Sequence, residues 1–369
     1  MRLWHSLTLI ALLLAGLSWS RAQTPSVHSQ TLYVFGTLVE IIIHSRDEQA
    51  ATAATHDIAQ LFQQLHRDWH AWEPGALQDV NQALAQGKPA PLTARLSDLV
   101  QLGQHLSCTS GGSFDPGIGG LVALWGFHAD TPPLGVIPST QEIAAWQGAG
   151  IADLQIRDGQ AHAHDPRVQL DLGGYAKGAA LDLAGQILIA HGLPDAILNA
   201  GGDVNVLGRH GHRPWRVAIR DPFVWGAVAS ISLSPGEVLY TSGNYERFFD
   251  SQGQRFSHLL DPRTGRPVQG IVSASVLGRN GARADAAATA LAVAGARDWT
   301  TTAARMGATA ALLITDDGTV LATPEMARRL DPGPTAHPVT VVPLPEADTP
   351  ACPGDVGFPT LAQAITANR

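Results

Sequence analysis

Residues 168–190 read VQLDLGGYAKGAALDLAGQILIA. The pattern predicts a strand over 168–172, a turn at Gly173 and Gly174, and a helix over 175–190 that ends at Gly192. A strand that enters a helix through glycines presents free backbone N–H groups at the helix N-terminus, which suits a phosphate group. Lys177 lies in the first helical turn, where a cation opposes the helix dipole, so an anionic ligand is expected beside it.

Helices and strands follow one another irregularly on both sides of this junction. Helical spacing covers 49–69, 97–108 (opened by Ser97 as the expected cap) and 284–294 (ended by Gly295). Strand patterns cover 31–43 (broken at Gly36), 196–198, 204–207, 215–219, 227–233, 272–277, 310–315 and 319–322. Because no regular strand–helix–strand repeat occurs, the sequence predicts a single mixed α+β domain with largely antiparallel sheets and flanking helices.

Both ends of the chain differ from its middle. Residues 1–22 resemble a secretory signal, with a basic Arg2, an apolar run over 7–17 and small residues at Ser20 and Ala22; an uncleaved anchor is the alternative. From Asp331 onward 8 of 39 residues are proline, which predicts an extended, peripheral tail over 331–369. The expected domain is therefore 23–330, in an exported protein that is periplasmic, free or associated with the inner membrane.

Composition narrows the classes of function. The 369 residues are 45% hydrophobic and 15% charged, as in folded proteins, and the formal charge of −8 disfavours a nucleic-acid partner. Of 24 basic residues only Lys88 and Lys177 are lysines. An exported chain meets an oxidising compartment, where Cys108 and Cys352 either form a disulfide or remain two thiols; the sequence leaves this open.

Further polar, glycine-rich segments surround the junction: Ser113–Gly120 (SFDPGIGG), Asn199–Asp203 (NAGGD), Thr241–Tyr245 (TSGNY), Arg255–Pro267 (RFSHLLDPRTGRP) and Ala284–Thr289 (ADAAAT). Asp285 and Thr289 are four residues apart, so on a helix their oxygens share a face and suit Mg²⁺. A capping Asp285 and a core Thr289 are the alternative. The pairs His162/His164 and His210/His212 are interpreted as surface histidines. Walker, GxGxxG, HExxH, GxSxG and CxxC motifs are absent from the sequence.

Taken in order, these segments resemble the ApbE family of FAD:protein FMN transferases. The resemblance runs from Phe35 to about Leu321 and rests on FDP with LWGF, LDLGGxAKG, GGD, TSGxY, SHxxDPxTGxP and ADAxAT. It implies a fold related to T-fold proteins. It also implies transfer of FMN from FAD to a Thr or Ser hydroxyl of a target flavoprotein, with release of AMP and assistance from Mg²⁺. The implied acceptor is a flavoprotein subunit of a membrane redox complex.

The resemblance also implies the site residues. The FAD site would be lined by Phe35, Trp72, Ser113, Phe114, Asp115, Asp171, Lys177 and Leu260. The metal would be held by the Gly174 carbonyl with Asp285 and Thr289. Asn244 stands where the family commonly has Asp.

The chemistry assigns roles to three of these side chains. Mg²⁺ and Lys177 would stabilise the negative charge that builds on the leaving AMP. His258, or Asp285, would accept the proton of the attacking hydroxyl. Two other functions are considered: a FAD diphosphatase, in which water replaces the acceptor, and a periplasmic FAD-binding protein without catalysis.

Overall fold

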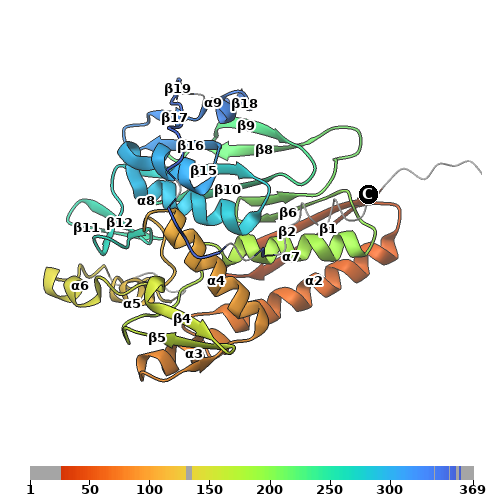
Figure 1. Cartoon of the computed structure of the whole chain (residues 1–369). Coiled ribbons are helices and arrows are strands. Elements are labelled where there is room, and N and C mark those ends of the chain that lie inside the picture. The colour runs from red at the N-terminus through yellow and green to blue at the C-terminus, as the bar shows by residue number, and fades with distance from the viewer. Residues whose placement is uncertain (1–25, 130–134, 336, 349, 355–356, 359–369) are drawn as a thin grey trace, which may run out of the picture.

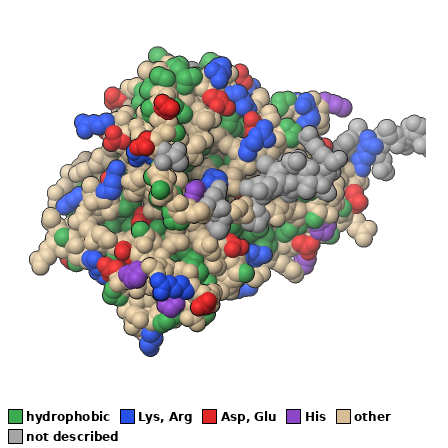
Figure 2. All heavy atoms as spheres, in the orientation of Figure 1, with side chains coloured by type: hydrophobic (Ala, Val, Ile, Leu, Met, Phe, Trp, Pro, Cys, Tyr) green, Lys and Arg blue, Asp and Glu red, His purple; other side chains and the backbone are tan. Residues whose placement is uncertain are grey.

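The computed structural model describes residues 26–129, 135–335, 337–348, 350–354 and 357–358. The predicted signal, residues 1–22, lies outside the described residues. Within the described part, no helix is long and apolar enough to span a bilayer. Figure 2 shows basic and acidic side chains intermixed over the face in view, without a broad basic patch.

A nine-stranded sheet forms the centre of the fold (Figure 1). Its neighbouring strands are antiparallel, except for the last pair, which is parallel. In spatial order the strands are β1 (Ser26–Val34), β2 (Thr37–Ser45), β6 (Ala196–Ala200), β7 (Asp203–Val206), β10 (Val238–Gly243), β15 (Ile271–Gly278), β16 (Ala310–Thr315), β17 (Val320–Ala322) and β19 (Val339–Val341).

Smaller sheets surround the central one. A three-stranded sheet has the order β18 (Leu330–Pro332), β9 (Ala227–Leu233), β8 (Trp215–Arg220), and another the order β3 (Ala90–Pro91), β5 (Gln160–Ala163), β4 (Leu154–Arg157). The two remaining sheets are the hairpins β11 (Phe248–Ser251) with β12 (Gln254–Ser257), and β13 (Leu260–Asp261) with β14 (Arg266–Pro267).

The two faces of the central sheet are covered differently. Along β10, Val238 and Tyr240 belong to a core shared with the helices, whereas Leu239 between them belongs to a second core shared with β8 and β9. Figure 1 shows most of the helices gathered on one side of the sheet. They are α2 (Glu48–Trp69), α3 (Ala76–Ala85), α4 (Ala94–Thr109), α5 (Gly119–Leu124), α6 (Thr140–Trp146), the short 3₁₀ helix η1 (Ile151–Asp153), α7 (Ala176–Ala190) and α8 (Gly281–Met306). The short helix α9 (Pro324–Ala327) belongs to the other side, where Met326 is part of the second core.

This architecture confirms the predicted mixed α+β fold with a largely antiparallel sheet, but two local predictions are wrong. Residues 168–172 form no strand: Gln169 makes one isolated bridge to Ile118, and the segment bonds to loops instead of to a ladder. The helix expected from Ser97 begins at Ala94, because the Thr93 hydroxyl accepts the Leu96 N–H. The predicted end of a helix at Gly295 is confirmed as a kink within α8: Gly295 has φ 75° and ψ 173°, and a second helical segment follows it.

The proline-rich tail contributes to both sheet layers. Strand β18 pairs with β9, β19 adds to the edge of the central sheet, and Phe358 is buried in the main core. Cys108, near the end of α4, forms a disulfide with Cys352 across 244 residues of chain. The tail is therefore fastened to the helix that leads into the loop carrying Ser113 to Asp115.

Candidate active site

One cavity of about 540 Å³ is lined by all the residues predicted to bind FAD, hold the metal or act in catalysis. Its walls come from the β1–β2 turn, the loops that follow α2 and α4, the start of α7, the β12–β13 connection and the start of α8. The predicted residues that line it are Phe35, Trp72, Ser113, Phe114, Asp115, Asp171, Gly174, Lys177, His258, Leu260, Asp285 and Thr289.

Aromatic rings form one part of the cavity wall. Phe35 and Gly36 close the β1–β2 hairpin with positive φ angles of 55° and 69°, a conformation that a phenylalanine rarely adopts. The ring of Phe35 packs edge-on against Phe62, with centroids 5.5 Å apart. Trp72 lies 5.7 Å from His128 in the same manner. The unusual backbone at Phe35 holds an aromatic side chain at the cavity, as expected for a site that binds a planar ring.

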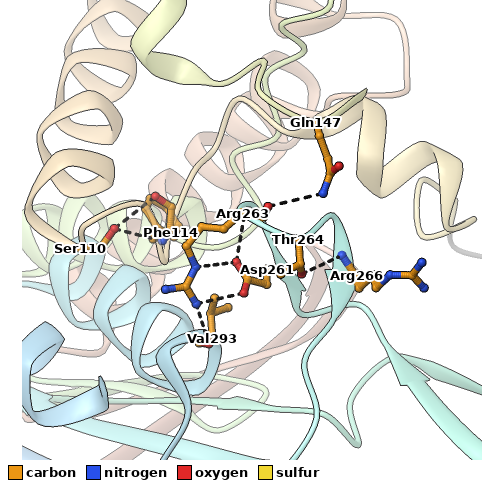
Figure 3. Close-up of polar contacts among 8 residues, drawn as sticks. All are labelled: Ser110, Phe114, Gln147, Asp261, Arg263, Thr264, Arg266 and Val293. Carbon is orange, nitrogen blue, oxygen red and sulfur yellow. Dashed lines mark hydrogen bonds and ion pairs between the residues drawn. The ribbon is translucent and has the colours of Figure 1, made fainter. Parts of the chain in front are cut away.

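The loop after α4 is fixed by hydrogen bonds at each end. Ser110 accepts the Phe114 N–H at 3.0 Å and donates to the Phe114 carbonyl at 3.3 Å (Figure 3). The Asp115 carboxylate accepts the N–H groups of Gly117 and Ile151 at 2.7 and 2.9 Å. Burial raises the pKa of Asp115 above its usual range, although these N–H donors oppose the shift. Phe114 and Asp115 are therefore rigid parts of the wall.

The segment before α7 places a glycine where a side chain would not fit freely. A Cβ on Gly174 would lie 3.0 Å from the Phe114 ring and 3.7 Å from the Thr289 hydroxyl. Asp171 accepts the Gly173 N–H at 2.8 Å, and burial raises the pKa of this carboxyl. The glycine pair thus brings backbone, rather than side chain, up to the start of α8.

Lys177 lies between two carboxylates at the centre of the site. Its Nζ is 2.7 Å from Asp203 and 3.5 Å from Asp285. Burial alone would lower the pKa of the amine, but the charges of Asp203 and Asp285 raise it above its ordinary value. Asp203 and Asp285 of the same chain already balance the charge of Lys177, and the anionic ligand expected beside it stays a prediction.

Asp285 and Thr289 face the cavity one turn apart on α8, as the spacing predicts. Asp285 accepts the Gly178 N–H at 3.1 Å, and burial raises its pKa while Lys177 opposes the rise. The Thr289 hydroxyl bonds to Ser242 at 2.9 Å rather than to its own helix. With the Gly174 carbonyl these are hard oxygen donors, which fit Mg²⁺. Among the described residues, no group of three or more His, Cys, Asp or Glu side chains forms an alternative metal centre.

His258 lines the cavity as a neutral imidazole. Its Nδ1 is 3.1 Å from the Arg247 carbonyl, which assigns the ring proton to Nδ1 and leaves Nε2 as the acceptor. Burial, followed by the charges of Arg247 and Lys177, lowers the pKa of His258 to about 4. Arg247 itself donates to the Phe127 and Ala129 carbonyls.

The turn after His258 is tied to α8. Arg263 donates to both carboxylate oxygens of Asp261 at 2.8 and 3.0 Å and reaches the Val293 carbonyl at 3.4 Å (Figure 3). Leu260 precedes this pair and is buried in the cavity wall. Two parallel N–H bonds fix the direction of the guanidinium, so the turn and the helix hold each other in place.

Several polar residues of the cavity wall were not predicted from the sequence, among them Asp203, Ser242 and Arg247. Asp203 belongs to the quoted GGD segment, which on its own indicates only a hairpin turn. Its ion-pair partner, Lys177, lies on α7, 26 positions earlier. Ser242, at the end of β10, bonds to Thr289 across 47 residues. Neither of the two H-x-H pairs lines the cavity.

Comparisons with known proteins show which family the chain resembles. A family model described as the ApbE family matches residues 35–313. A protein of Rhodobacter capsulatus named FAD:protein FMN transferase is 54% identical over 336 residues, which are 90% of this chain and 64% of that protein. A protein of Vibrio cholerae with the same name is 33% identical over 56% of this chain and 63% of its own length. The chain thus spans somewhat less than two thirds of the length of these relatives.

Solved structures are similar over most of the chain. The crystal structure of the ApbE protein of Thermotoga maritima has a TM-score of 0.77 and 26% identity, covering 83% of this chain and all of that one. The apo form of the flavinyl transferase ApbE of Pseudomonas stutzeri has a TM-score of 0.75 and 27% identity, covering 84% of this chain and 98% of that one. A family match over more than half of the chain and a shared fold lead to one conclusion: this protein belongs to the ApbE family.

Proposed function

We propose that this protein transfers FMN from FAD to a Thr or Ser hydroxyl of a target flavoprotein, in a reaction that depends on Mg²⁺ and releases AMP. The observation that carries the proposal is the junction of an aromatic wall with a lysine, two buried carboxylates and a threonine hydroxyl in one cavity. Relatives that bear the name FAD:protein FMN transferase support it. The proposed FAD-site residues are those that line the cavity at Phe35, Trp72, 113–115, Asp171, Lys177 and Leu260.

The proposed placement of FAD follows from the two kinds of wall. Aromatic rings such as Phe35 and Phe114 offer faces and edges to the flavin or adenine ring. Lys177 is the proposed contact of the diphosphate, since its ammonium lines the cavity, as Arg247 does, and stands beside Asp285 of the proposed metal site. Its ammonium can turn from Asp285, at 3.5 Å, towards a phosphate oxygen while it keeps the shorter contact to Asp203.

The bonds balance as a substitution at phosphorus. The acceptor oxygen forms a bond to the phosphorus of the FMN half, the diphosphate P–O bond breaks, and AMP leaves with the bridging oxygen. The acceptor proton goes to Nε2 of His258, which is neutral and therefore free to receive it. Lys177 stabilises the charge that develops on the leaving group. Mg²⁺, when held by Asp285, Thr289 and the Gly174 carbonyl, would supply further neutralisation of the diphosphate.

The partner and the compartment of the protein are proposed together with its function. A subunit of a membrane redox complex is the proposed acceptor, and the signal-like residues 1–22 support export to the periplasm. A disulfide between Cys108 and Cys352 is consistent with an oxidising compartment.

Release of AMP tests the proposal against its alternatives. The protein is incubated with FAD and Mg²⁺, with and without a Thr-bearing acceptor protein, and AMP is quantified by chromatography. A transferase yields one AMP per acceptor modified and little AMP without acceptor. AMP and FMN formed equally well without acceptor would identify a FAD diphosphatase, and FAD that stays intact in both reactions would leave a FAD-binding protein.

A further inference from the structure

The starts of α7 and α8 share the sequence pattern Gly-Ala-x-x-Asp. Residues 178–182 read Gly-Ala-Ala-Leu-Asp and residues 281–285 read Gly-Ala-Arg-Ala-Asp. The two helices pack against each other, and each segment lies in the first turns of its helix (Figure 1). The matching Gly and Asp positions suggest that the two helix ends use the same contacts.

The contacts are reciprocal. Asp285 of α8 accepts the Gly178 N–H of α7 at 3.1 Å, and Asp182 of α7 accepts the Gly281 N–H of α8 at 2.8 Å. Each carboxylate therefore satisfies an N–H group that the first turn of the other helix leaves without a helical partner. Negative charge is also stabilising at both positions, because each helix dipole has its positive end there.

The two glycines let the helices approach closely enough for this exchange. A Cβ on Gly178 would lie 2.3 Å from the Gly281 backbone, and one on Gly281 would lie 2.6 Å from the Gly178 carbonyl oxygen. Since backbone cannot move aside as a flexible side chain can, any larger residue would separate the helix ends. We call this pair of glycines and aspartates the reciprocal clasp.

The two carboxylates have different second partners. Asp285 faces the cavity and Lys177, whereas Asp182 is fully buried and does not line the cavity. The second oxygen of Asp182 accepts from Asn205 at 2.9 Å, and Asn205 in turn accepts from the Tyr240 hydroxyl at 2.7 Å. Asp182 is thus held from β7 and β10, the strands behind the helices.

We propose that Asp182 is a positioning residue for the candidate site. Through the Gly281 N–H it sets where α8 begins, and hence where Asp285 and Thr289 stand relative to Gly174 and Lys177 at the start of α7. This inference rests on the function proposed above and adds to it a residue outside the cavity that determines metal binding and turnover. Groups that orient metal ligands from outside commonly change metal affinity or activity by about 10- to 100-fold when they are replaced.

The exchange of Asp182 and Asn205 provides the test. In Asp182→Asn the new amide still accepts the Gly281 N–H, but its own NH₂ meets the NH₂ of Asn205. In the double variant Asp182→Asn with Asn205→Asp, the donor and acceptor are interchanged and the pair is restored. Asp221→Asn is the matched control, because Asp221 is equally buried, accepts the Phe223 and Val224 N–H groups and lies outside the cavity.

Two readouts separate positioning from simple stability. The first is the Mg²⁺ concentration that gives half of the Mg²⁺-induced rise in Tm of the FAD-loaded protein, and the second is kcat and KM for FAD in the transfer reaction. Asp182→Asn should raise the half-maximal Mg²⁺ concentration and lower kcat by about tenfold or more, with KM for FAD nearly unchanged. The double variant should recover both, and Asp221→Asn should lower Tm alone.

Several results would overturn the proposal. It fails if Asp182→Asn changes Tm only, as the control does, or if the double variant folds without recovery. It also fails if both Asp182 variants do not fold while Asp221→Asn does, because the residue would then serve stability alone. If the wild type transfers no FMN, the proposed function falls, yet the Mg²⁺ titration of the same variants still decides whether Asp182 positions the site.

Discussion

Replacement of Lys177 by Met removes the charge at the centre of the site and keeps an unbranched side chain that is one atom shorter. The ammonium neutralises Asp203 at 2.7 Å and Asp285 at 3.5 Å, whose side chains are only 7% and 4% exposed. Removing one partner of a fully buried ion pair costs about 3–5 kcal/mol, because the remaining charge stays buried. The Lys177 side chain is 29% exposed, so solvent screens part of this cost, and we expect a loss of about 2–3 kcal/mol.

The same change should slow transfer more than it weakens FAD binding. A single charge that stabilises the developing negative charge contributes about 10²- to 10³-fold to kcat. Urea unfolding at pH 7.5 measures the free energy of unfolding, and AMP release measures kcat. Lys88→Met is the control, since the Lys88 side chain is exposed and its ammonium donates to the nearby exposed Gln86. Wild-type stability together with wild-type kcat in Lys177→Met would refute the role of the ammonium described here.

Three further predictions concern packing, protonation and the tail. Gly178→Ala should lower the free energy of unfolding by about 3 kcal/mol, the upper end for overpacking, because its Cβ would clash with the Gly281 backbone. Urea unfolding measures the loss, and a variant as stable as the wild type would contradict the close approach of the two helices. The pKa of His258 is lowered from 6.5 to about 4, so as pH falls the unfolded chain binds a proton at this residue before the folded protein does. Up to about 3 kcal/mol of stability is therefore lost between pH 6.5 and 4. His258→Gln should flatten that part of the pH–stability curve, and an unchanged curve would contradict the lowered pKa. Cys352→Ser removes the disulfide that closes a loop of 244 residues. It should lower the free energy of unfolding by about 2–5 kcal/mol and leave kcat unchanged. A fall in kcat without loss of Tm would contradict a structural role of the disulfide.

The sequence indicates four helices, α2, α4, α7 and α8, and most strands of the main sheet, because their apolar periods reflect burial on one face; it does not indicate the shorter helices α3, α5, α6 and α9. The helix expected over 49–69 is α2, and the hairpins at Gly36 and at Gly201–Gly202 lie where the glycines predict turns. The error at 168–172 has the same origin. Leu170 and Leu172 are buried in a segment that bonds to loops, and burial alone produces the pattern of a strand.

The candidate site was predicted where its chemistry is local and missed where it depends on tertiary contacts. Asp285 and Thr289 share a helix face, so their spacing is visible in the sequence. The pairing of Lys177 with Asp203, and the exchange between Asp182 and Gly281, join elements whose distance along the chain carries no pattern of its own. A comparison of the two GAxxD segments would have pointed to the second of these contacts.

The intact mass of an acceptor protein shows whether this protein transfers FMN. A Thr-bearing acceptor and its Thr→Val variant are each incubated with FAD, Mg²⁺ and either the wild-type protein or Asp285→Asn. FMN transfer to the threonine predicts one FMN-sized addition on the threonine acceptor with the wild-type protein, and none in the other three reactions. An acceptor of unchanged mass, in a reaction where the protein demonstrably binds FAD, would contradict FMN transfer as the function of this cavity.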